Sequence, residues 1–100
     1  MSNPWSNRLT VIGSKRQVQR FRKSNWNTSL CARHCELLEN SPTRFACEFK
    51  TERLLPESLR KLSRRWPRLT LLLDFESETK RIKGLAKAKA GELEHCEINY

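Results

Sequence analysis

The sequence predicts a single α+β domain over residues 1–100, in which two to three helices cover one face of a mainly antiparallel sheet of four to five strands. Three observations lead to this fold class. The 100 residues suffice for one hydrophobic core. Apolar and polar residues alternate over 69–76 and again over 82–88, which is typical of half-buried strands. Apolar residues at helical spacing follow Ser14 and Pro56.

The first strand is predicted at 8–12, and a helix follows it. Ser14, with Gln17 three residues later, forms a capping box, which is typical of a helix N-terminus. Val18 and Phe21 share one side of this helix. We therefore expect these two side chains to face the sheet.

A second helix is predicted at 29–39, with Thr28 as its N-cap. Several side chains of this segment recur at helical spacing, so they are expected to form one stripe. The stripe comprises Leu30, Cys31, His34, Cys35 and Leu38.

Residues 44–50 predict another strand, because Phe45, Cys47 and Phe49 share one face of an extended chain. A further helix follows, with Pro56 near its first turn, where the missing N–H of proline costs little. Pro67 ends this helix.

The last third of the chain predicts two hairpins. In the first, a four-residue loop at 77–80 places Glu76 opposite Arg81 and Asp74 opposite Lys83, so that opposite charges meet on the outer face. The even-numbered residues of 82–88 are then expected to face the interior. The odd-numbered residues are expected to face solvent.

In the second hairpin, a three-residue loop at 89–91 leads into a strand at 92–99. This register places Lys83 opposite Glu97 and turns His95 outward. It also turns Cys96 inward, beside Gly84. The predicted order of elements is β-α-α-β-α-β-β-β.

The same assignments predict the hydrophobic core. Its members are the inward-facing apolar residues Leu9, Val11, Val18, Phe21, Phe45, Cys47, Phe49, Leu59, Leu62, Leu69, Leu71, Leu73, Phe75, Ile82, Cys96 and Ile98.

The chain carries 20 Lys and Arg against 11 Asp and Glu, a formal net charge of +9, which favours acidic partners. Two blocks of basic residues lie on the solvent sides of predicted helices that cover the same face of the sheet. Together they predict one positive surface, which can contact phosphates without reading base sequence. We call it the basic helix layer, and its residues are Lys15, Arg16, Arg20, Arg22, Lys23, Arg60, Lys61, Arg64 and Arg65.

The open face of the predicted sheet is a second candidate surface. It is expected to carry an apolar row, Leu72, Leu85 and Leu93, beside His95. Such a row can seat a protein partner or a second copy of the chain. The same face carries no aromatic ring on which RNA bases stack. Its lysines are expected to pair with acids on neighbouring strands. We therefore reject it as an RNA platform.

The cysteines leave alternatives open. Cys31, His34, Cys35 and Cys47 are residue types that bind zinc, but structural zinc usually takes a Cys-x2-Cys turn, whereas the spacing here is Cys-x3-Cys. A redox or disulfide pair is another interpretation. We favour burial of the cysteines as small apolar side chains. No metal or cofactor is expected.

No catalytic arrangement is complete in the sequence. Nucleophilic catalysis needs a base that a third group orients, and nothing near His34 in sequence supplies that group. The three glycines are too scattered to form a phosphate-binding loop. We therefore expect a protein that is not an enzyme.

Two stretches resemble a known family. Trp-Ser-Asn-Arg-Leu-Thr-Val-Ile-Gly at 5–13 is similar to the W-x-N-x-L-x-V-x-G opening of the YubB-like domains of bacteria, plasmids and phages. Residues 62–69, with Trp66-Pro67 before a Leu-rich strand, and Lys83-Gly84 resemble the later pattern of that family. The resemblance implies a two-layer ferredoxin-like sandwich and brings no catalytic residues. A strict ferredoxin-like order has two strands between the helices, where the predicted order has one.

The chain begins without the pattern of a secretory signal, and no apolar run approaches the roughly 20 residues that a bilayer span needs. We therefore expect a cytoplasmic protein, a monomer or weak homodimer, that does not bind membranes. Interaction with an acidic protein, or self-association, is the function that we favour at this point. Sequence-independent nucleic-acid binding through the basic helix layer is the alternative.

Overall fold

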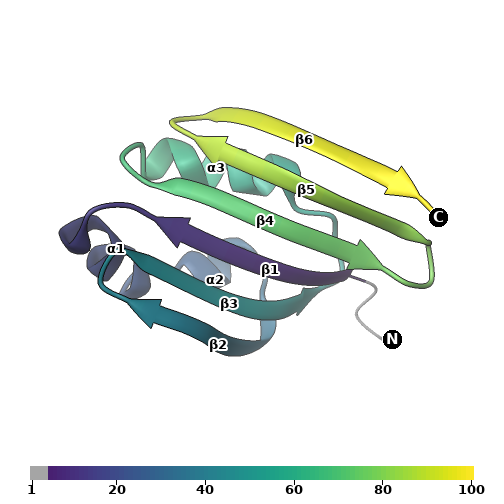
Figure 1. Cartoon of the computed structure of the whole chain (residues 1–100), viewed down its shortest axis with the longest axis horizontal. Coiled ribbons are helices and arrows are strands. Elements are labelled where there is room, and N and C mark those ends of the chain that lie inside the picture. Colours follow the sequence, from purple (N-terminus) through teal and green to yellow (C-terminus); the bar gives the residue numbers. More distant parts are fainter. Residues whose placement is uncertain (1–4) are drawn as a thin grey trace.

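The computed structural model describes residues 5–100 as a six-stranded antiparallel sheet with three helices on one face (Figure 1). Its strand order is β2-β3-β1-β4-β5-β6, so β1 lies in the middle between β3 and β4. The elements are β1 (Trp5–Ile12), α1 (Lys15–Arg22), α2 (Trp26–Ser29), β2 (Arg33–Ser41), β3 (Arg44–Thr51), α3 (Pro56–Arg65), β4 (Thr70–Ser77), β5 (Ile82–Lys89) and β6 (Glu92–Asn99).

The α+β class and the helices on one face are confirmed, but the prediction of four to five strands is wrong. The additional strand comes from the predicted helix at 29–39, most of which is strand β2. Only the four residues of α2 are helical in this region. Of these four, Ser29 alone belongs to the predicted segment. Cys31 and His34 have left-handed backbone conformations, with φ of 54° and 55°, which no α-helix contains. The predicted helical stripe therefore does not exist.

The first hairpin has the predicted strands but a different register. Ser77 pairs with Ile82, so that the loop covers 78–81, and the Ser77 hydroxyl accepts a hydrogen bond from the backbone N–H of Lys80 (3.3 Å). The register is displaced by two residues, which keeps every side chain on its predicted face. Glu76 thus lies opposite Lys83, not Arg81, and Asp74 lies opposite Leu85, not Lys83.

The predicted register of β6 is wrong by one residue. Ala90 and Gly91 both have positive φ (50° and 85°), so the hairpin closes through a two-residue turn and not the predicted three-residue loop. A displacement of one residue turns each side chain of a strand to the opposite face. Cys96 therefore lies opposite Leu85 on the open face, and His95 lies opposite Ala86 on the helix side.

The core lies between the sheet and the helices. It includes the predicted residues of β1, α1, β3, α3 and β4, together with Leu69. Cys96 and Ile98 are exposed, and Ile82 is only partly buried, so these three predictions are wrong. Trp26 was missing from the prediction; its ring stacks on Phe21 with 5.8 Å between centroids. The other core residues that the prediction missed are Trp5, Leu30, Leu55 and Ala46, while Ala86 and Ala88 are buried on the face where they were expected.

Within residues 5–100, no helix has both the length and the apolar character that a bilayer crossing requires.

Candidate nucleic-acid interface

Helix α1 presents its basic side chains to solvent because its two apolar residues anchor it to the sheet. The predicted cap is confirmed: the Ser14 hydroxyl accepts a hydrogen bond from the backbone N–H of Gln17 (3.3 Å). Val18 and Phe21 are buried. All five predicted basic residues of this helix and its C-cap are exposed, namely Lys15, Arg16, Arg20, Arg22 and Lys23.

Helix α3 is held in the same way, through buried Leu59 and Leu62. Its buried Ser63 hydroxyl also accepts a hydrogen bond from the backbone N–H of Gly91 (2.9 Å), which ties the helix to the β5–β6 turn. Lys61, Arg64 and Arg65 are exposed. The two helices therefore turn their basic sides away from the same face of the sheet (Figure 1).

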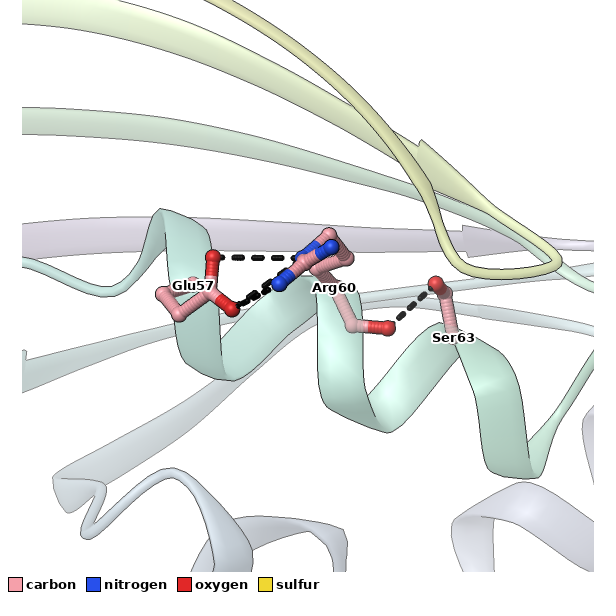
Figure 2. Close-up of polar contacts among 3 residues, drawn as sticks. All are labelled: Glu57, Arg60 and Ser63. Carbon is pink, nitrogen blue, oxygen red and sulfur yellow. Dashed lines mark hydrogen bonds and ion pairs between the residues drawn. The ribbon is translucent and has the colours of Figure 1, made fainter.

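Arg60 differs from the other bases of this helix because it has an acidic partner in the same helix. Figure 2 shows its guanidinium beside the carboxylate of Glu57, which accepts bonds of 3.1 and 3.2 Å from Nε. These hydrogen bonds lower the pKa of Glu57 and raise the pKa of Arg60. Among the basic residues of α3, Arg60 is thus the one that already forms an ion pair with an acid.

Part of the basic helix layer comes together at a groove of about 380 Å³ between α1 and the connection from α3 to β4. The groove exists because Trp66 packs edge-on against Phe21, with 5.3 Å between ring centroids, which joins the end of α3 to α1. Its lining combines three arginines, an indole and no acidic residue: Gln17, Arg20, Arg65, Trp66, Pro67 and Arg68.

The arginines of this groove are free to meet an anion. Within the described part of the chain, no carboxylate forms an ion pair with Arg20, Arg65 or Arg68. Arg65 makes one long hydrogen bond, from Nη1 to the Ser29 hydroxyl (3.5 Å). Like-charged guanidinium groups around one hollow repel each other, and a bound anion relieves that repulsion.

The groove adds four residues to the predicted site: Gln17, Trp66, Pro67 and Arg68. None of these four was among the predicted contact residues. The structure leaves Trp66 only partly buried, at the edge of the core. The cluster of bases around Trp66-Pro67 was a sequence signal for this site. The contact between Trp66 and Phe21 of α1 had no such signal.

The open face of the sheet has a different electrostatic character. Arg8 pairs with Glu48 at 3.4 Å, and the Lys50 ammonium donates a hydrogen bond to the Ser6 hydroxyl (2.6 Å). Register places Lys87 opposite Glu94. Two shallow hollows of about 700 and 830 Å³ lie on this face, and each is lined by both acids and bases.

The predicted apolar row on the open face is incomplete. Leu72 and Leu85 lie there as expected, and Leu85 is 57% exposed. Leu93 and His95 lie on the helix side, because of the register of β6, so their assignment to the open face is wrong. Exposed Ile98 takes a place on the open face that the prediction had not given it.

The four candidate metal-binding residues do not form a site. Cys31 lies before β2, His34 and Cys35 lie in this exposed edge strand, and Cys47 is buried in β3. Among residues 5–100, no three His, Cys, Asp or Glu side chains are grouped as metal ligands. The expectation that the cysteines are buried holds for Cys47 alone, since Cys31, Cys35 and Cys96 are exposed free thiols.

Comparison with known proteins found no matching family model, no matching curated protein and no matching solved structure.

Proposed function

We propose that this protein binds nucleic acid through its basic helix layer, with the phosphate backbone as the main contact. One observation carries the proposal: the exposed bases of α1 and α3 share these helices with a single acid, Glu57, which is occupied by Arg60. Phosphates supply the missing negative charge, and the release of their counterions supplies affinity without base reading.

The positions of these residues favour the helix side over the open face as the binding surface. From the sequence, a protein partner or a second copy of the chain was expected to dock there on an apolar row. That row loses Leu93 to the helix side, and the charges around it are paired across the strands. An acidic protein at the basic helix layer remains the competing partner, because its carboxylates carry negative charge as phosphates do.

The experiment compares charge reversal on the two faces. In the first variant, Arg20→Glu, Arg64→Glu and Arg65→Glu change the helix side; in the matched control, Lys50→Glu, Lys83→Glu and Lys87→Glu change the open face by the same net charge. Binding to a fluorescent 20-nucleotide DNA is measured by anisotropy, and folding is checked by circular dichroism. We expect the helix-side variant to lose about hundredfold or more in affinity, since several phosphate contacts disappear together. The control should lose far less.

The second measurement follows the affinity for DNA as the salt concentration rises and as a competing polyanion is added. A protein that makes about six phosphate contacts loses on the order of a thousandfold in affinity between about 50 and 200 mM salt. Equal losses in the two variants, or no binding at low salt, would contradict the proposal. Stronger competition by poly-glutamate than by DNA of equal charge would favour an acidic protein partner.

The finer description of the fold is also a proposal. We propose a two-layer ferredoxin-like sandwich for the first six main elements, extended by the β5–β6 hairpin. The order β1-α1-β2-β3-α3-β4, with two strands between the main helices and β1 in the middle, supports it. A relation to the YubB-like domains, a cytoplasmic location and the absence of catalysis stay predictions.

A further inference from the structure

We propose that the groove around Trp66 binds one nucleotide of a single strand, with the phosphate on its arginines and the base stacked on the indole. This inference rests on the proposed function and adds the form of nucleic acid that the site selects. Of the three hollows described above, it uses the one where an aromatic ring lies together with several bases and no acid.

The indole of Trp66 is held in place before any ligand arrives. One side of it packs against the core, where its ring plane meets that of Phe21 at an interplanar angle of 74°. Its backbone is fixed as well, since its N–H donates to the carbonyl of Ser63 (3.2 Å) and its carbonyl accepts from the N–H of Leu69 (3.1 Å). A ring that is already ordered loses little entropy when a base stacks on it.

The charges around the ring suit a phosphate. Arg20 reaches the groove from α1, while Arg65 and Arg68 reach it from either side of Trp66-Pro67. A guanidinium can donate two parallel hydrogen bonds to phosphate oxygens, which a lysine cannot. The site therefore combines an anion-binding set with a flat apolar surface, as proteins that bind single strands do.

The size of the groove and the presence of the ring distinguish a single strand from a duplex. About 380 Å³ lies at the small end of the range for ligand sites, roughly 300–1,000 Å³, so it suits one nucleotide. In a duplex, the faces of the bases are covered by their neighbours, and only the phosphates are offered to such a groove. In a single strand, a base can leave its neighbours and stack on Trp66.

The test separates the base from the phosphate. Binding of the wild-type protein to a 12-nucleotide oligothymidylate is compared with binding to an abasic deoxyribose-phosphate strand of the same length, both labelled with fluorescein, at about 50 mM salt. Stacking of one base on an aromatic side chain is measured at roughly five- to 150-fold in affinity. We expect the oligothymidylate to bind at least fivefold more tightly than the abasic strand.

Two variants assign that preference to the groove. Trp66→Leu should remove the preference while it leaves the affinity for the abasic strand within about twofold. Trp66→Phe, which keeps a ring against Phe21, should retain part of the preference. Arg68→Gln should weaken binding to both strands, since it removes a phosphate contact. If Trp66→Leu fails to fold, the wild-type comparison and Trp66→Phe decide the question.

The outcomes distinguish this inference from the proposed function. Equal affinity of the wild-type protein for the two strands overturns the stacking of a base, although nucleic-acid binding stands. A preference that survives Trp66→Leu also overturns it. If neither strand binds, the proposed function itself fails. A 12-residue glutamate peptide that binds as tightly as the oligothymidylate identifies an acidic peptide as the ligand and overturns both.

Discussion

The helix side and the open face of the sheet carry the same kinds of charged residue, but they balance them differently. On the open face, strand register places an acid beside most bases, as with Arg8 between Glu48 and Asp74. On the helix side, the bases of α1 and α3 share those helices with Glu57 alone. A sheet can neutralise its own charges across strands, whereas α1 and α3 carry too few acids to pair their bases within the helix, apart from Glu57 with Arg60. Unbalanced charge on the helix side therefore points to a partner outside the chain.

The largest difference between the two faces is expected in thiol chemistry. Burial under the helices, with a smaller effect of nearby Cys35, raises the pKa of Cys47 from 9.0 to about 12, while Cys96 is exposed on the open face. The thiolate is the reactive form, so Cys47 should react with iodoacetamide at pH 8 on the order of a thousandfold more slowly than a thiol of ordinary pKa. Peptide mass spectrometry would measure both rates. Comparable labelling of Cys47 and Cys96 would contradict the placement of the two strands.

The same burial gives a stability effect with a definite sign. The folded state holds the proton of Cys47 more tightly than the unfolded state, so this contribution to stability is complete below pH 9 and is lost as pH rises toward 12. Chemical denaturation at a series of alkaline pH values should show a smaller decline for Cys47→Ala than for the wild-type protein. Parallel declines would show that Cys47 does not titrate in this way.

Substitutions at two neighbouring residues of β5 should differ in their cost to stability because the residues lie on opposite faces of the sheet. A Cβ at Gly84 would overlap the Phe75 ring and approach the Cys96 carbonyl oxygen to 2.7 Å. Gly84→Ala should therefore destabilise the protein by roughly 1–3 kcal/mol, as overpacked cores do. Leu85→Ala, on the open face, should cost much less. Urea denaturation compares them, and a neutral Gly84→Ala would show that the β4–β5 register is incorrect.

The smallest effect is expected where charges are already balanced. Arg8 and Glu48 are both about half exposed, and such pairs contribute roughly 0–1 kcal/mol. Arg8→Gln should thus leave both thermal stability and affinity for DNA nearly unchanged. A loss of DNA affinity comparable with that of Arg68→Gln would place part of the interface on the open face.

Sequence patterns succeeded where burial imposes a period. The alternation of β3 and β4, the cap of α1 and Pro56 in the first turn of α3 were all predicted from such signals. Strand β2 is exposed along nearly its whole length and has irregular pairing with β3, so no alternation marks it. Cysteines and leucines of β2 and of the segment just before it happen to recur at helical spacing, and this coincidence produced the incorrect helix.

Register was harder to predict than the strands themselves. Charge complementarity did not fix the alignment of β4 and β5: Glu76 meets a base in either register, but Asp74 lies opposite Leu85 in the observed one. For β6, the predicted register depended on whether two or three residues form the turn. Nothing in the sequence strongly indicates that Ala90 adopts its left-handed conformation. The basic helix layer was predicted because charge is visible in sequence. The groove was not, because only packing brings Trp66 to Phe21.

The central claim is that nucleic acid contacts the helix side of the molecule. The arginine Nε–H signals in a ¹⁵N–¹H NMR spectrum, assigned by single Arg→Lys variants, report on both faces in one titration with the oligothymidylate. We expect the signals of Arg20, Arg65 and Arg68 to shift first and saturate together, while those of Arg8 and Arg44 stay in place. Early shifts of Arg8 and Arg44, with those of the groove unmoved, would contradict it.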